Sequence, residues 1–92
     1  MVYQITEYSK RQAKKLGVKI KPSTNPLKKI DVFKDGKKIS QIGAIGYSDY
    51  PTYINEKGKK YADERRRLYR IRHRGEDKDV GTPGYYAWKI IW

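Results

Sequence analysis

The dipeptide Asp35-Gly36 is the feature that most constrains how this 92-residue chain can fold. It separates the run Ile30–Phe33, in which residues alternate, from a second run, Lys37–Ile39. Asp and Gly both tolerate the positive φ that a two-residue turn requires, so the pattern strongly indicates a β-hairpin. We therefore expect an antiparallel hairpin over Lys28–Ile45, and the rest of the chain has to pack around it.

Two further elements are expected before the hairpin. Glu7–Leu16 carries its apolar residues near one helical face, with Thr6 placed to cap the start. Gly17 is well placed to end this helix in the left-handed conformation. From Val18 to Lys21 the pattern then changes to a period of two, which is typical of a strand with one wet face, and Pro22 is expected to end this strand. The first quarter of the chain therefore predicts a basic amphipathic helix followed by a strand.

The second half of the chain predicts two more helices. Lys59–Arg74 has an apolar face, and Thr82-Pro83 looks like an N-cap followed by Pro at the first helical position of an aromatic segment. A strand is the alternative for that last segment. Pro51 and nearby glycines favour an irregular connection over Tyr47–Tyr53. We expect one α+β domain over residues 1–92, a small antiparallel sheet centred on the hairpin and packed by two or three short helices.

The charge of the chain points to an acidic partner. Lys and Arg number 22 against 10 Asp and Glu, a formal net charge of +12. Such an imbalance disfavours the compact state through self-repulsion, which a polyanion would relieve. A solvated surface alone is the alternative, but solubility needs a net charge of only about 2–8 in a small domain. A high isoelectric point, here near 9.9, is the electrostatic footprint of nucleic-acid binding.

The helix predicted at Lys59–Arg74 is the best candidate for contact with phosphate. From residue 57 to residue 74 there are nine basic and two acidic side chains, a net charge of +7. Arginine matches phosphate oxygens with two donors and also stacks on bases. The alternative is a solvated face, with Arg65 and Arg72 packed over aromatic neighbours. The candidate nucleic-acid-binding side chains here form a stripe with a four-residue repeat and one adjoining position: Arg66, Arg70, Arg74 and Arg67.

The hairpin supplies a second basic set for the same role. Its candidates are Lys28, Lys29, Lys37 and Lys38. Lysine on a sheet also protects its edge from pairing with other chains, and this reading is at least as good.

Aromatic residues suggest a different kind of partner. Tyr, Trp and Arg dominate the energetic centres of protein–protein interfaces, and this chain has nine Tyr and two Trp. The alternative is that these rings form the core, because hydrophobic residues make up only 37% of the chain. The candidate protein-interface residues are Tyr47, Tyr50, Tyr53 and Trp92.

No pattern in the chain indicates catalysis, and we expect a non-enzymatic protein without cofactor or metal. There is no Cys, hence no thiolate nucleophile, and no glycine-rich nucleotide signature. The carboxylates Asp31, Asp49, Asp63 and Glu64 show no spacing typical of a two-metal site. The single histidine, His73, is expected to have a structural or a surface role.

The sequence also favours a location inside the cell. No apolar run approaches the ~18 residues of a membrane span, and no secretory segment follows Met1. We expect an intracellular protein that is not secreted, or one packaged in a particle made inside the cell.

Five segments of the chain together resemble a family of small basic proteins encoded by large double-stranded DNA viruses of algae and amoebae. The segments are Ala13–Val18, Lys29–Phe33, Ile42–Tyr53, Ala62–His73 and Gly81–Ala87. The resemblance runs from about Tyr8 to Trp92 and brings no established activity. It implies a viral setting, in which a small basic protein contacts packaged DNA or forms a minor structural piece of the virion.

Two hypotheses follow for the function. The leading one is binding of nucleic-acid backbone, DNA rather than RNA, by the arginines and hairpin lysines. Such contacts position a protein without reading sequence. The rival is a minor capsid protein that docks on other virion proteins through its Tyr and Trp side chains.

Overall fold

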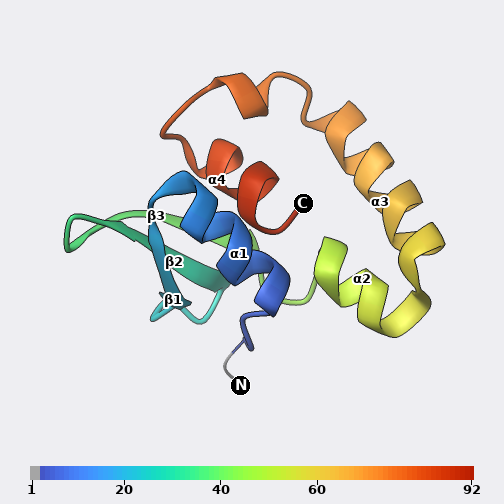
Figure 1. The fold of residues 1–92 in the computed structure, drawn as a ribbon, viewed down its shortest axis with the longest axis horizontal. Coiled ribbons are helices and arrows are strands. Elements are labelled where there is room, and N and C mark those ends of the chain that lie inside the picture. Colours follow the sequence, from blue (N-terminus) through green and yellow to red (C-terminus); the bar gives the residue numbers. More distant parts are fainter. Residues whose placement is uncertain (1–2) are drawn as a thin grey trace.

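The computed structural model describes residues 3–92 and shows an α+β fold (Figure 1). A three-stranded antiparallel sheet in the order β1-β2-β3 is combined with four α-helices and a short 3-10 helix. The elements are α1 (Glu7–Leu16), β1 (Lys19–Pro22), β2 (Lys28–Lys34), β3 (Lys37–Ala44), α2 (Tyr50–Lys57), α3 (Lys59–Arg72), η1 (Glu76–Lys78) and α4 (Pro83–Ile90).

The hairpin is confirmed. Strands β2 and β3 pair antiparallel, with Lys34 opposite Lys37 across the turn. Asp35 and Gly36 have φ values of 52° and 79°, as a turn of this type requires. The register shifts between Val32 and Phe33, an irregularity that increases the local twist of the strands.

The first helix and the first strand are also confirmed. The hydroxyl oxygen of Thr6 accepts a hydrogen bond from the backbone N–H of Ser9, and Gly17 ends α1 with φ 73°. The strand begins at Lys19, one residue later than predicted, because Val18 turns into the core.

The irregular connection predicted over Tyr47–Tyr53 is wrong from Tyr50 onward, where α2 begins. The Asp49 carboxylate caps this helix by accepting a hydrogen bond from the backbone N–H of Thr52 at 3.1 Å. Pro51 lies in the first turn, where backbone N–H groups make no hydrogen bond within the helix, so the lack of an N–H in proline costs nothing. Its fixed φ also suits a helix. Proline therefore starts a helix here and does not interrupt one.

The later helices follow the sequence prediction closely. Helix α3 begins at Lys59 as expected and ends at Arg72, two residues before the predicted end, because His73 leaves the helical conformation. Helix α4 starts after Thr82, whose hydroxyl oxygen accepts from the backbone N–H of Tyr85. The alternative of a terminal strand is thereby excluded.

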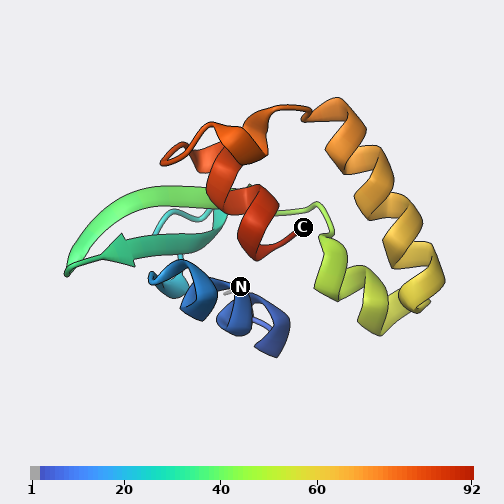
Figure 2. The same cartoon turned by 45° about the horizontal axis from the view of Figure 1, so that its top comes forward.

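The hydrophobic core lies between the sheet and the helices α1 and α4 (Figures 1 and 2). The Ser9 hydroxyl on α1 is fully buried and donates to the backbone oxygen of Ile90 at 3.0 Å, which ties the two helices together. We call this part of the molecule, with its sheet, α1 and α4, the sheet half. The buried apolar side chains that form its core are Ala13, Val18, Ile30, Val32, Ile42, Tyr86, Ile90 and Ile91.

Helices α2 and α3 form a separate helical hairpin, here called the arm, which lies beside the sheet half (Figures 1 and 2). Gly58, with φ 90°, makes the sharp turn between them. The arm meets the sheet half through two contacts of Tyr50. Its backbone N–H donates to the backbone oxygen of Ile91 at 3.0 Å, and its ring centroid lies 5.4 Å from that of Tyr8. Within residues 3–92, no helix has the length and apolar character that a membrane crossing would need.

Candidate functional site

The four arginines predicted on the second helix do lie together in the structure. Arg66, Arg67, Arg70 and Arg74 line one open hollow of about 400 Å³ along α3. Helical spacing places Arg66, Arg67 and Arg70 on one side of α3, because residues three and four apart are neighbours there. Arg74, predicted on the helix, lies instead in the turn just after α3 ends at Arg72. We call these four residues the arginine face.

The first two members of the arginine face already have partners. Arg67 binds Glu64 with two donors, at 3.1 and 2.6 Å, and this pair lowers the pKa of Glu64. The Arg66 guanidinium lies 4.0 Å from the centroid of the Tyr50 ring and 3.6 Å from the Asp63 carboxylate. Arg66 is therefore partly a structural residue, since it packs on Tyr50 at the start of α2.

The other two members are more open. Arg70 donates to the backbone oxygen of Trp92 at 3.3 Å and lies 5.2 Å from the Trp88 ring. Arg74 is exposed, and no carboxylate within residues 3–92 lies close enough to pair with it. Exposed ion pairs such as Arg67 with Glu64 contribute only about 0.2–1 kcal/mol, so an incoming phosphate can compete for these guanidinium groups.

Lys29 was predicted as a phosphate contact, and the structure places it elsewhere. The side chain is buried, with only 4% of the residue exposed, and its ammonium binds the Asp49 carboxylate at 3.0 Å. Asp49 is itself fully buried and also accepts from the Tyr3 hydroxyl at 2.7 Å. Burial and the neighbouring Asp49 charge raise the pKa of Tyr3. Lys29 thus serves a buried ion pair that links β2 to the start of α2.

The remaining hairpin lysines do not join the arginine face. Lys37 and Lys38 lie next to the hairpin turn, which is at the opposite end of the molecule from α3 (Figures 1 and 2). Lys38 pairs with the buried Asp31 at 3.1 Å. Lys28 is half-buried at the other end of β2. The predicted surface of arginines and lysines is therefore not one continuous patch.

Asp31 holds the loop between β1 and β2 in place. Burial opposes its ionisation, but hydrogen bonds from Ser23, Lys38 and the Thr24 backbone outweigh burial and lower the pKa of Asp31 to about 2. The carboxylate is only 1% exposed. Its role is structural.

The four aromatic residues predicted at a protein interface fall into three environments. Tyr50 is buried, and its hydroxyl donates to Asp63 at 2.7 Å, so it is not available for docking. Tyr47 is 76% exposed. Tyr53 and Trp92 are half-buried and line a cleft between the arm and the sheet half.

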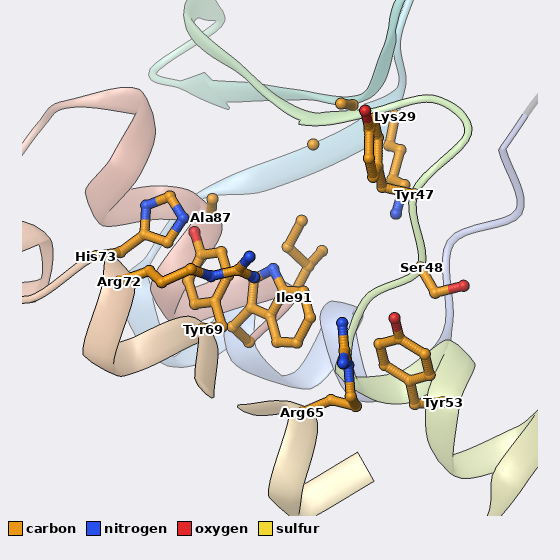
Figure 3. A pocket seen from close by; sticks show the side chains of 13 residues that line it. Lys29, Tyr47, Ser48, Tyr53, Arg65, Tyr69, Arg72, His73, Ala87 and Ile91 are labelled. Atoms are coloured by element: carbon orange, nitrogen blue, oxygen red, sulfur yellow. The ribbon is translucent and has the colours of Figure 1, made fainter. Parts of the chain in front are cut away.

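This inner cleft has a volume of about 500 Å³ and lies between α3, the end of α4 and the loop after β3 (Figure 3). Arg65 and Arg72 extend into it from α3, on a different side of the helix from the arginine face. The sequence prediction treated these two residues only as possible packing over aromatic rings. Their seven-residue spacing, which matches two helical turns, is the signal that could have placed them on one line. The chief polar and aromatic lining residues are Arg65, Arg72, His73, Tyr53, Tyr69 and Trp92.

A stack of three rings forms one wall of the inner cleft. The Tyr69 ring stacks on both Trp92 and His73. Its ring centroid lies 4.3 Å from that of Trp92, with an interplanar angle of 8°, and 4.1 Å from that of His73, with an interplanar angle of 19°. Burial raises the pKa of Tyr69 to about 12, and the nearby Glu76 adds to the rise. His73 Nδ1 lies 2.6 Å from a Glu76 carboxylate oxygen.

The carboxylates considered for metal binding lie apart. Asp31 and Asp49 are buried in the networks described above, whereas Asp63 pairs with Lys59 at 2.8 Å and Glu64 with Arg67. Hydrogen bonds from Lys59 and Tyr50 lower the pKa of Asp63. Across residues 3–92, no three His, Asp or Glu side chains gather into a group that could hold a metal ion.

Comparison with known proteins gives no relative: no protein-family model, no curated protein and no solved structure matches this chain.

Proposed function

We propose that this protein binds nucleic-acid backbone without catalysis, through the arginine face of α3. The observation that carries the proposal is that Arg66, Arg67, Arg70 and Arg74 line one open hollow. They do so on the arm, the most basic segment of a chain whose net charge is +12. Packaged viral DNA, which the resemblance described in the sequence analysis implies, is the partner that we propose.

The chemistry of the arginine face suits phosphate. Each guanidinium offers a planar fork of donors that matches two phosphate oxygens, and it stays charged at any physiological pH. The surface ion pair of Arg67 with Glu64 keeps its fork oriented while leaving both side chains more than half exposed. Neutralising phosphates releases counterions, so binding of this kind weakens steeply with salt. It does not depend on sequence, because phosphate contacts carry no base information.

The test is retention of a random DNA duplex across a salt series by the variant R67E/R70E/R74E. Arg66 is left in place because it packs on Tyr50. Arg70 also contacts Trp88 and Trp92, so circular dichroism checks that the variant keeps its fold. We expect the wild-type protein to lose affinity with a slope of about 0.9 per neutralised phosphate in log affinity against log salt, and the variant to lose most of its binding. The control is K14E/K19E/K34E, which changes the net charge equally at exposed positions of the sheet half and is expected to keep most of the affinity.

Equal losses in the two variants would contradict the assignment to α3 and would mean that only total charge matters. Absence of binding by the wild-type protein at low salt would overturn the proposal altogether. The rival function, docking on another virion protein, would then take its place. It is favoured by the exposure of Leu27, Ile45 and Tyr47, of which Leu27 and Ile45 are joined by a backbone hydrogen bond.

A further inference from the structure

The inner cleft has the features of a nucleotide site, and it shares no lining residue with the hollow of the arginine face. Its volume of about 500 Å³ is within the range of small-ligand sites, roughly 300–1,000 Å³. It is lined by cationic and aromatic side chains from the arm and the sheet half (Figure 3). The question is which ligand matches this combination.

The positive charge that is free in the cleft comes from two arginines. Lys29 is neutralised by Asp49, and the Glu76 carboxylate lies 2.6 Å from His73. Arg65 and Arg72 differ, since among the residues that the structure describes no carboxylate lies within ion-pairing distance of either. They are separated by two helical turns, or ~10 Å along the axis. This spacing allows them to contact phosphates on both sides of one nucleotide.

The rings provide a surface for a base. Trp92 is stacked on Tyr69 on one side, whereas Tyr53 is tilted against it by 51° at 6.2 Å. Within residues 3–92 no second ring lies parallel to Trp92. The Arg65 guanidinium lies 5.6 Å from the Tyr53 ring, so a cation and an aromatic face are already adjacent. Proteins that bind single strands combine such rings with a basic groove, because every base has a face that can stack.

We propose that the inner cleft receives one unpaired nucleotide of a single-stranded nucleic acid. The base packs against Trp92 and Tyr53, and the flanking phosphates bind Arg65 and Arg72. A base paired within a duplex is not accessible to such a cleft, whereas an unpaired base enters at little cost. The inference rests on the proposed backbone binding and adds to it a preference for single strands over duplex.

The experiment compares binding of fluorescently labelled ligands by the full chain, measured by anisotropy at one low salt concentration. The ligands are an oligothymidine strand, an abasic strand of the same length, an oligouridine strand and a DNA duplex. The abasic strand keeps the phosphates and removes the bases. We expect the wild-type protein to bind oligothymidine roughly 5- to 150-fold more tightly than the abasic strand, the range that stacking of one base supplies.

Two cleft variants and one control identify the residues responsible. W92L should bring the ratio of oligothymidine to abasic affinity close to one. R65Q/R72Q should weaken binding of every single strand while leaving duplex binding nearly unchanged. The control R67Q/R74Q removes the same charge from the arginine face and should weaken duplex and single strands alike. Circular dichroism of each variant checks that the fold is retained.

A wild-type ratio near one, or a ratio that W92L leaves unchanged in a folded protein, would overturn the cleft proposal. The proposed function would survive that result as long as R67E/R70E/R74E loses its binding of duplex DNA. Failure of the cleft proposal is therefore distinguishable from failure of the proposed function. If W92L weakens the binding of oligothymidine and of oligouridine equally, the cleft accepts unpaired nucleotides of either sugar. A loss confined to one of them would assign it to DNA or to RNA.

Discussion

The sheet half and the arm are stabilised by different chemistry. The sheet half encloses an aliphatic core in which Ile30, Val32 and Ile90 are fully buried. Helix α3 of the arm buries only Ala62 and Tyr69 and attaches through rings and guanidinium groups. Aliphatic burial is non-directional and strong, at ~25 cal/mol per Å², whereas ring stacking and cation–π contacts tolerate adjacent charge and partial exposure. The sheet half therefore depends on aliphatic burial, whereas the arm depends on contacts that tolerate partial exposure.

The largest effect is expected at the buried ion pair between Lys29 of the sheet half and Asp49, which caps α2 of the arm. Replacing Lys29 with Met leaves the Asp49 carboxylate buried without its cation, and we expect a loss of about 3–5 kcal/mol in the free energy of unfolding. The measurement is the urea midpoint with an unchanged m-value. The neighbouring Lys28→Met is the control and should change stability far less, since Lys28 is half-exposed and has no ion pair with a residue in the described range 3–92. A loss below about 1 kcal/mol in Lys29→Met would show that the pair is dispensable.

A second test compares matched truncations in the two parts. Ile30→Ala removes methyl and methylene groups from a fully buried position, and we expect it to cost about 2–5 kcal/mol. Ile71→Ala makes the same change on the arm, where the side chain is 50% exposed, and should cost within about 0.5 kcal/mol. Thermal unfolding followed by circular dichroism measures both. Similar costs would mean that the arm buries its apolar residues as thoroughly as the sheet half does.

The smallest expected effect depends on pH. The pKa of Asp31 is lowered to about 2 in the folded protein, below its ordinary value of 3.8. A carboxylate with a depressed pKa contributes stability above its unfolded pKa, and this contribution is lost as the pH falls from about 4 to 2. We expect Asp31→Asn to cost about 1–3 kcal/mol at pH 7 and to differ little from the wild type near pH 2.

The arm supplies the control for that titration. Glu64→Gln removes a carboxylate whose ion pair is exposed, so it should alter stability much less than Asp31→Asn at neutral pH. Urea unfolding at a series of pH values gives both curves. If Asp31→Asn keeps its full deficit at pH 2, the buried hydrogen bonds do not depend on the ionised form of Asp31.

Much of the fold was predictable because its signals are local. Asp35-Gly36, Thr6 with Gly17, and Thr82-Pro83 each set the start or end of an element from neighbouring residues. Helix α2 was missed because Pro51 and the nearby glycines were interpreted as signs of an irregular connection. The capping carboxylate of Asp49, three residues before Thr52, was the signal that could have corrected this.

The candidate site was predictable only as far as one helix reaches. Three members of the arginine face, Arg66, Arg67 and Arg70, follow from helical periodicity on α3. Arg74 joins them from the turn after the helix, which periodicity alone does not predict. The burial of Lys29 depends on Asp49, twenty residues away, and the inner cleft depends on contacts of α3 with the far end of the chain. Period-two alternation in β2 shows that Lys29 and Asp31 share a side of the strand, but not that both side chains are buried in ion pairs.

The position of the two tryptophans gives the molecule an internal optical reporter. Both Trp88 and Trp92 lie against Tyr69, so the intrinsic emission of the unlabelled protein arises at the junction between the arm and the sheet half. Far-ultraviolet circular dichroism reports instead on every helix and strand. Coincident unfolding midpoints by the two signals would make the molecule a single cooperative unit, and an earlier emission change would identify the arm as a unit that detaches before the sheet unfolds.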